Sequence, residues 1–339
     1  MKKLIATLLL IATLLTSMLA LAACNEPPED ETVIKIGYMQ GPTGMGIAKL
    51  IHDNGGINGN EKYKFVKYGK ATDATAALLS GEIDMACLPT NNASIIYNTK
   101  NAAVQALAIN CLNSLFLMTK TGTSITSFEQ LEGKTIHTIS NGTPKVILEH
   151  ILSAKGINAT VSTTAVVGGV EKTLAEPSDL ASTLIAGAVD IALVPEPVAT
   201  AAPLKIASMQ KDYAYSVAFD ITDVWATVSD APIAMGCIVG RSAFVKEHKT
   251  VVDKFLAEYK SSVEFISNPE NLNDAADYVV EAGVLDAAPA AKKSLTNLGE
   301  SIAYVDGDEM KNTLIKFYTA LGNSLIGGKL PDEKFYYKK

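Results

Sequence analysis

The chain contains a single arginine, Arg241, among 29 basic residues that stand against 36 acidic residues. Arginine holds carboxylates and phosphates through a planar guanidinium that donates two parallel hydrogen bonds, so a site built from several such clamps is excluded. The net charge of −7 argues against nucleic acid, and against an anionic lipid surface as the main partner. An anion would have to be bound by backbone amides at helix starts, by hydroxyl groups or by lysine.

Cysteine and histidine are also scarce, at four residues each. Cys87, Cys111 and Cys237 lie in apolar, strand-like segments, where a free thiol behaves as a small hydrophobic side chain. Three internal cysteines allow one disulfide at most. Because no C-x-x-C, H-x-x-x-H, G-x-S-x-G or Walker pattern occurs, we expect no metal, no cofactor and no catalytic residue.

A long hydrophobic run occurs at the N-terminus. Two lysines precede an apolar segment, 4–21, which ends in Leu-Ala-Ala-Cys at 21–24. This pattern is typical of an export signal, and its end resembles a lipobox, where a cysteine is lipidated. We expect 1–23 to be a lipoprotein signal peptide, Cys24 to carry the lipid, and 24–32 to be a tether. The protein would then be extracytoplasmic and anchored to the cell membrane, the alternative being an uncleaved transmembrane helix.

Beyond residue 32, short apolar runs alternate with helical patterns. The expected strands lie at 33–38, 63–68, 83–88, 103–110, 114–120, 133–139, 161–166, 189–194, 215–221 and 232–240. The expected helices between them lie at 45–53, 73–81, 93–100, 127–131, 144–156, 179–187 and 197–205. This alternation predicts the α/β class with parallel sheets.

The alternation restarts after the fifth strand, and from Val245 onward the pattern is mostly helical. The chain is long for one compact core and suits two lobes. We expect 33–119 and 223–339 to form lobe I and 120–222 to form lobe II, with the first crossing near Lys120. The helix-rich C-terminal part would complete lobe I.

Four sequence segments follow one another along the chain: Gly-Pro-Thr-Gly-Met-Gly at 41–46, an expected helix–glycine–strand unit at 79–89, the segment at 127–144, and a second helix–glycine–strand unit at 184–197. Together they resemble substrate-binding proteins of ABC transporters with the two-lobe type II periplasmic fold, in the nitrate, sulfonate and thiamine-precursor branch. The resemblance covers roughly 33–337. It implies that a ligand binds between the lobes, that the lobes close on it, and that the closed form docks on a membrane permease.

In parallel α/β sheets, ligands bind at the carboxyl ends of the strands. Four such ends are followed by helix starts with polar groups, which ordinary helix capping would also explain. The candidate ligand-binding residues there are Tyr38, Gln40, Gly41, Thr43, Gly44, Thr90, Asn91, Asn92, Asn141, Gly142, Thr143 and Glu196. Asn113 and Trp225, near the two expected crossings, complete the set.

These observations predict a monomeric lipoprotein that binds a small polar or anionic organic ligand and delivers it to an ABC importer. It would have no catalytic step and no nucleic-acid partner. Three alternatives stay open: a receptor that signals through a membrane protein after closing on its ligand, an extracellular enzyme on the same fold, and a structural lipoprotein.

Overall fold

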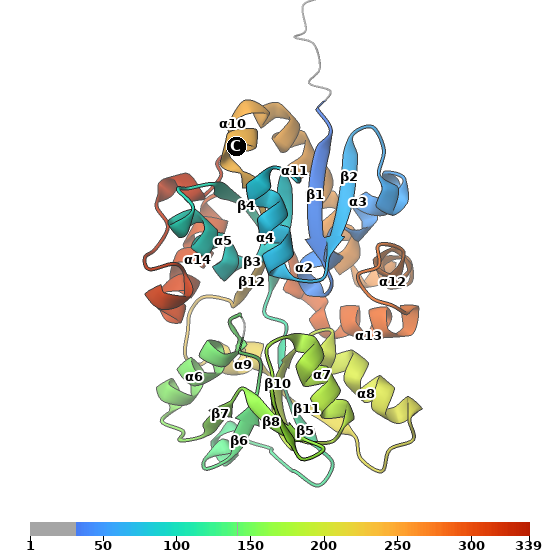
Figure 1. Ribbon diagram of the computed structural model, residues 1–339, viewed down its shortest axis with the longest axis vertical. Coiled ribbons are helices and arrows are strands. Elements are labelled where there is room, and N and C mark those ends of the chain that lie inside the picture. The colour runs from blue at the N-terminus through green and yellow to red at the C-terminus, as the bar shows by residue number, and fades with distance from the viewer. Residues whose placement is uncertain (1–31, 141) are drawn as a thin grey trace, which may run out of the picture. The chain divides into compact units, whose positions relative to one another are not determined.

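The computed structural model describes residues 32–140 and 142–339, in which Val33–Lys339 form one compact unit (Figure 1). The expected signal peptide, the lipidation site Cys24, nearly all of the tether and the candidate Asn141 lie outside the described residues. None of the helices within the described ranges is long and apolar enough to cross a membrane.

The first sheet has six strands in the order β13-β4-β12-β3-β1-β2. The strands are β1 (Ile34–Met39), β2 (Tyr63–Tyr68), β3 (Met85–Pro89), β4 (Val104–Leu112), β12 (Ala234–Arg241) and β13 (Ile302–Val305). β1 runs parallel to β2 and β3, whereas β12 runs antiparallel to β3 and β4. The expected parallel sheet is therefore mixed, because β12 enters this sheet from the opposite end after the chain returns from the second sheet.

Helices cover both faces of the first sheet. They are α2 (Pro42–Met45), α3 (Ala48–Asp53), α4 (Ala71–Ser80), α5 (Thr90–Thr99), α10 (Ser242–Glu247), α11 (Lys249–Ser267), α12 (Leu272–Glu281), α13 (Ala288–Leu298) and α14 (Gly307–Leu321). These helices pack on the sheet because each has an apolar face. In α11, for example, the buried residues recur every three or four positions, among them Val252, Phe255, Leu256 and Tyr259. We call this sheet with its helices the first lobe.

The second lobe is built on a five-stranded sheet in the order β11-β5-β10-β6-β7. Its strands are β5 (Leu115–Lys120), β6 (Thr135–His137), β7 (Thr160–Ser162), β10 (Ile191–Pro195) and β11 (Tyr215–Asp220), and its helices are α6 (Pro144–Lys155), α7 (Pro177–Ile185) and α8 (Val198–Ser208). A separate hairpin is formed by β8 (Thr164–Val167) and β9 (Val170–Thr173). The expected strand 161–166 is therefore split between β7 and β8. β5 is antiparallel to both of its neighbours, so this sheet is mixed as well.

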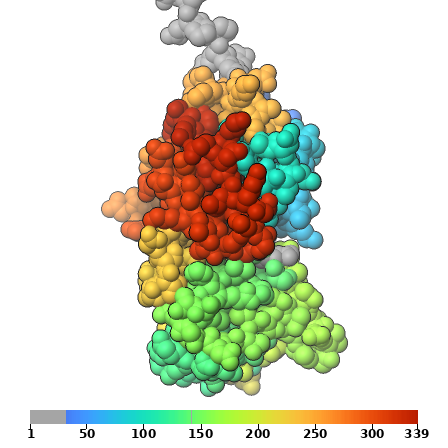
Figure 2. Space-filling view, turned by 90° about the vertical axis from the view of Figure 1, so that its left-hand side faces the viewer, coloured from blue at the N-terminus to red at the C-terminus, as the bar shows by residue number. Residues whose placement is uncertain are grey.

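The chain crosses between the lobes twice. The first crossing is Asn113–Ser114, both with positive φ, and the second follows α9 (Ile221–Trp225). The backbone N–H of Asn113 donates to the carbonyl of Ile233 at 2.6 Å, so the two crossings are hydrogen-bonded to each other. The first crossing precedes the one expected near Lys120, because β5 pairs with β10 and β11 of the second sheet. The C-terminal helices return to the first lobe, whose side they cover in Figure 2.

Candidate ligand-binding site

The two lobes meet where β1 and β3 end and where α6 and α8 begin (Figure 1). A Cβ added to Gly41, after β1, would lie 3.4 Å from Cδ of Pro197, before α8. The hydroxyl of Thr143, before α6, lies 3.7 Å from the sulfur of Met235 in β12. The backbone N–H of Glu196 donates to the carbonyl of Ser114 at 3.1 Å. We call this region the junction.

On the first-lobe side, Asn110 of β4 organises the polar groups of the junction. Its side-chain amide donates to the carbonyl of Thr43 at 3.0 Å and to the hydroxyl of Tyr259 at 2.9 Å. A Cβ added to Gly236 would lie 2.4 Å from Cγ2 of Thr43 and 2.6 Å from Oδ1 of Asn110. Only glycine therefore allows β12 to pass this close to both side chains.

The start of α5 supplies two further predicted residues. The hydroxyl of Thr90 donates to the carbonyl of Ala234 at 2.5 Å, and its own carbonyl accepts from Tyr318 at 2.7 Å. Asn91 is 5% exposed, and its side-chain oxygen has no hydrogen-bond partner among the described residues. The neighbouring Asn92 is partly exposed. Thr90 thus holds the loop in place, while Asn91 keeps an acceptor that the protein does not use.

On the second-lobe side, Glu196 is the central residue and is 1% exposed. Its Oε1 accepts from the hydroxyl of Thr200 and from the side-chain amide of Asn297, both at 2.8 Å. Its Oε2 makes no hydrogen bond of ordinary geometry among the described residues, although the equally unpartnered hydroxyl of Ser294 is near enough to lower the pKa of this carboxyl. Burial raises the pKa of this carboxyl, against the opposing effect of the hydrogen bonds from Asn297 and Thr200. Helix α8 begins at Val198 with Pro197 at its N-cap position, so Glu196 precedes the N-cap by one residue, and the backbone N–H of Thr200 in the first turn acts on its carboxyl.

Thr143 occupies the N-cap position of α6, as expected, with Pro144 as the first helical residue. Its side chain makes no capping hydrogen bond and contacts Met235 across the junction instead. The preceding Gly142 is exposed. The junction therefore joins Gly41, Thr43, Thr90, Asn91, Thr143 and Glu196 from the predicted set.

The sequence did not point to Asn110, Gly236 or Asn297. Asn297 lies in α13, far along the chain from Glu196, and α13 packs on α8 across the junction. A weak signal exists in hindsight: Asn297 follows the buried Ser294 by three positions, which places two polar groups on one side of an otherwise apolar helix face. Asn110 lies inside a buried strand, where a polar side chain needs a partner.

The structure gives several other predicted residues a different place. Tyr38 is 1% exposed and donates its hydroxyl to the carbonyl of Ala282 inside the first lobe. The indole N–H of Trp225 donates to the carbonyl of Ala231, and its ring contacts Phe317.

Three more of the predicted ligand-binding residues are not among those that the junction brings together. Asn113 links the two crossings, Gln40 is exposed, and Gly44 is buried within α2, where an added Cβ would meet the carbonyl of Met39.

Arg241 and the three internal cysteines do not belong to the junction. Arg241 ends β12 at the edge of the first sheet away from the junction, where it pairs with Asp84 at 2.6 Å. Within the described ranges no group of His, Cys, Asp and Glu side chains could hold a metal ion. The three internal cysteines are free, and burial raises the pKa of Cys87 and of Cys111 to about 12. The junction is thus lined by uncharged polar groups and one buried carboxyl.

Two lobes joined by two crossings, with polar groups gathered where they meet, define the class of two-lobe periplasmic binding proteins. A family model described as NMT1/THI5 like matches residues 62–272, and the chain belongs to this family. The resemblance drawn from the four sequence segments is confirmed at the level of family and fold. A comparison with curated protein sequences gives no match.

Solved structures share the fold at low sequence identity. An ABC transporter structure from Parabacteroides distasonis gives a TM-score of 0.71 at 20% identity, covering 91% of this chain and 99% of that one. The aliphatic sulphonate binding protein SsuA from Escherichia coli gives 0.66 at 16% identity, covering 90% and 92%. The nitrate-binding protein NrtA from Synechocystis gives 0.56 at 14% identity, covering 83% and 75%.

Proposed function

We propose that this protein is the extracytoplasmic solute-binding component of an ABC importer, held to the membrane by lipid on Cys24. One observation carries the binding role: Asn91, Asn110 and Glu196 each bury a side-chain oxygen at the junction that has no hydrogen-bond partner among the described residues. Buried polar atoms are nearly always paired, so such a group of acceptors supports a bound polar molecule. The names of the similar structures, which include binding proteins of ABC systems, support the transport role.

The ligand that suits these groups is a small, polar organic molecule, neutral or singly negative, that carries hydrogen-bond donors. The three unpartnered oxygens accept hydrogen bonds, and Glu196 would attract an amine or a ring N–H. A small dianion fits poorly, because the only arginine lies at the far edge of the sheet, paired with Asp84. A thiamine precursor, or another organic molecule that carries N–H groups, is therefore favoured over nitrate.

Binding would work by shifting the balance between open and closed lobes. The lobes are linked by two crossings near Asn113 and Ile233, and the contacts Thr143–Met235 and Glu196–Asn297 form only when the lobes meet. A ligand that binds groups from both lobes adds contacts to the closed state alone and so increases its population. The permease would recognise that closed arrangement.

The first test is native mass spectrometry of the protein purified from its own cells, before and after denaturation. We expect a small molecule to be released on denaturation, and its mass to narrow the ligand class. Asn91→Ala should raise the Kd roughly tenfold, as expected for the loss of one buried hydrogen bond, and so lower the amount of ligand that stays bound through purification. The matched control is Asn312→Ala, on an exposed position of α14. A protein that releases nothing and shows no thermal shift with any organic ligand would contradict the binding role.

The anchor is tested separately by the intact mass of the membrane-extracted protein. We expect residues 1–23 to be absent and Cys24 to carry a diacylglyceryl group. Cys24→Ala should release the protein from membranes in a carbonate wash. A membrane-extracted chain that still begins at Met1 would support the transmembrane alternative instead.

A further inference from the structure

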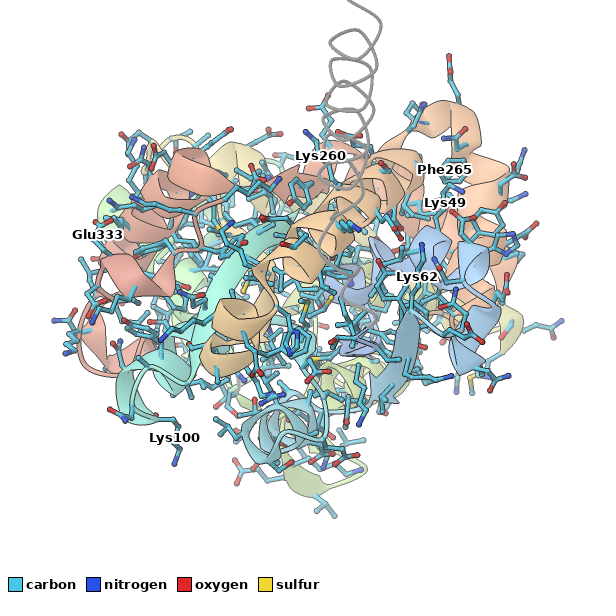
Figure 3. All side chains as sticks on the ribbon, turned by 90° about the horizontal axis from the view of Figure 1, so that it is seen from above. Lys49, Lys62, Lys100, Lys260, Phe265 and Glu333 are labelled. Atoms are coloured by element: carbon cyan, nitrogen blue, oxygen red, sulfur yellow. The ribbon has the colours of Figure 1, made fainter. Side chains whose placement is uncertain are left out.

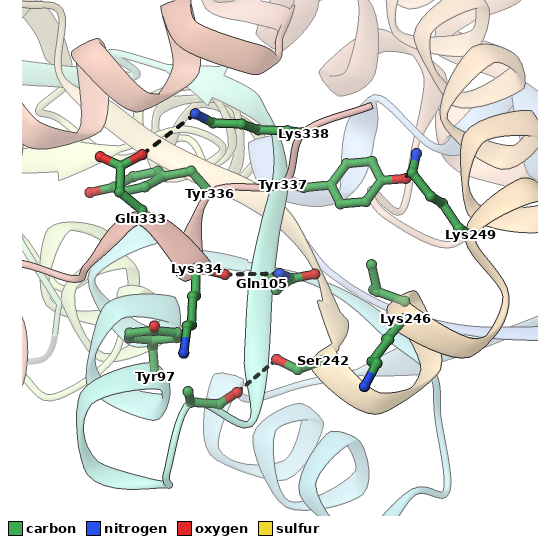
Figure 4. A pocket seen from close by; sticks show the side chains of 12 residues that line it. Tyr97, Gln105, Ser242, Lys246, Lys249, Glu333, Lys334, Tyr336, Tyr337 and Lys338 are labelled. Carbon is green, nitrogen blue, oxygen red and sulfur yellow. Dashed lines mark hydrogen bonds and ion pairs between the residues drawn. The ribbon is translucent and has the colours of Figure 1, made fainter.

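A hollow of about 540 Å³ opens on the first lobe beside the C-terminus (Figure 4). Four lysines line it, and Glu333 is the one acidic residue among the lining residues. We call it the lysine hollow, and besides Glu333 its charged and aromatic lining residues are Lys246, Lys249, Lys334, Lys338, Tyr97, Tyr336 and Tyr337. This surplus of positive charge stands out in a chain whose net charge is −7.

The positive charge of the hollow is only partly neutralised by the protein. Glu333 is paired with Lys338 at 3.5 Å and also with Lys311. The ammonium groups of Lys246 and Lys334 form no hydrogen bond or ion pair within the described ranges, and both residues are exposed. Lys334 is attracted by the neighbouring carboxylate of Asp332, so Lys246 is the ammonium group most available to an anion from outside the protein.

The other carboxylates near the hollow have hydrogen-bond partners, but a neutral hydroxyl leaves the negative charge of Asp332 in place. Asp253 accepts from Lys249 and from the hydroxyl of Tyr337, and Asp332 accepts from the hydroxyl of Tyr97. The tyrosine rings give the hollow apolar walls with polar rims, a combination that suits the boundary between water and lipid.

The hollow lies at the edge of the first sheet where β1 begins. The side-chain carboxylate of Asp84 accepts from the backbone N–H of Lys35, the second residue of β1. The backbone carbonyl of Asp84 accepts from the N–H of Arg241 at 2.9 Å. The next residue, Ser242, lines the hollow and donates its N–H to the carbonyl of Ala103. This edge is opposite the one that faces the junction, where β1 and β3 end.

Further lysines lie at the same edge. The carbonyl of Lys62 accepts from the N–H of Ile34 at the start of β1, and the carbonyl of Lys100 accepts from the N–H of Ala103. Figure 3 looks down on this end of the compact unit and shows Lys62 and Lys100 on different sides of it. Lysines are therefore spread around the edge at which the chain enters the compact unit, with Lys62 lying 3.9 Å from the carboxylate of Glu258.

We propose that the lysine hollow binds the phosphate groups of anionic lipids and so orients the anchored protein with its junction away from the membrane. This inference rests on the proposed lipid on Cys24, because a tether of residues 24–32 spans about 30 Å at most. The edge carrying the hollow is then within reach of the headgroups. Each lysine near an anionic membrane surface strengthens binding about fivefold, an effect that salt screens.

The test uses the full lipidated protein in vesicles of phosphatidylcholine, with or without about 30 mol% phosphatidylglycerol. Acetylation of each lysine is followed by peptide mass spectrometry. On the anionic vesicles we expect Lys246 and Lys334 to react about fivefold more slowly, and high salt to restore their rates. Lys172 and Lys205, exposed in the second lobe, should change less than about twofold.

A variant pair separates the hollow from general charge. Lys246→Gln with Lys334→Gln should abolish the lipid-dependent protection of Lys338, whereas Lys205→Gln with Lys211→Gln, both exposed in the second lobe, should leave it unchanged. Equal rates on both kinds of vesicle would overturn the proposal. So would the same protection by inorganic phosphate without vesicles, which would make the hollow a small-anion site. A missing lipid on Cys24, seen in the intact mass, would instead overturn the proposed anchor.

Discussion

Asn297 in the first lobe donates its side-chain amide to Glu196 in the second lobe at 2.8 Å. The same amide lies 3.0 Å from the hydroxyl of Thr200, so one side chain of α13 holds two residues at the start of α8. The bond to Glu196 is charge-assisted whenever the carboxyl is ionised, which strengthens it. This contact makes the C-terminal part of the chain a component of the junction.

Asn297→Ala removes both hydrogen bonds and leaves a buried carboxyl with one donor fewer. We expect the free energy of unfolding to fall by about 1–3 kcal/mol and ligand binding to weaken, since the closed lobes lose a contact. Urea denaturation monitored by circular dichroism measures the first effect. Asn312→Ala, exposed on α14, is the control. Equal stability of the two variants would show that the contact does not hold the lobes together.

Glu196 should make stability depend on pH. Its pKa is raised in the folded protein above the ordinary 4.5, so the folded state binds its proton more tightly than the unfolded state. The resulting stabilisation is complete below about pH 4.5 and is lost as pH rises through the folded pKa. Glu196→Gln does not titrate and should therefore gain stability relative to the wild type between pH 4 and pH 8.

Urea denaturation at a series of pH values measures this difference. Glu300→Gln, at an exposed position of the first lobe, is the control and should keep the wild-type dependence. Parallel pH curves for the wild type and Glu196→Gln would mean that the carboxyl is hydrated in solution.

Gly236→Ala tests the close approach of β12 to the junction. The new Cβ would lie 2.4 Å from Cγ2 of Thr43, so either the Thr43 side chain or the strand must move. We expect a loss of about 1–3 kcal/mol in the free energy of unfolding, together with weaker ligand binding. Gly69→Ala has no heavy atom within 4 Å of the added Cβ and should be nearly neutral. A neutral Gly236→Ala would show that this contact relaxes freely.

Arg241 and Asp84 form the ion pair at the opposite edge of the first sheet. The guanidinium also donates through Nε to the carbonyl of Ile83 at 3.2 Å, and Asp84 is 7% exposed. Arg241→Met should cost about 2 kcal/mol, a value discounted because the arginine is partly exposed. Asp84→Asn and the double variant complete the comparison. The double variant should lose clearly less stability than the sum of the losses in the two single variants. Additive losses would show that the pair is not coupled.

The local pattern of the chain predicted most elements closely. The expected strand 63–68 is β2 (Tyr63–Tyr68), and the expected helix 144–156 is α6 (Pro144–Lys155), which proline and glycine delimit. β9 was missed because its four residues are all exposed and carry no apolar alternation. β13 was missed because it pairs only with β4, far away in the sequence.

Part of the junction could be predicted because it follows from the class of fold. Loops at the carboxyl ends of strands share one edge, and this brings Gly41, Thr90 and Asn91 together opposite Thr143 and Glu196. Sequence spacing cannot tell which polar side chains turn inward. Tyr38 and Trp225 are candidate ligand-binding residues in the sequence, but their hydroxyl and N–H are used inside the protein.

The sequence by itself determined the α/β class, the scarcity of arginine and the four polar helix starts, because hydrophobic period, composition and turn chemistry are local properties. Only the tertiary structure decided that β12 runs antiparallel to its neighbours, that Asn297 reaches Glu196, and that Lys246 and Lys334 share one hollow. Each of these depends on burial and pairing between segments that are distant in the chain. Local preference does not encode such contacts, and the packed core selects them.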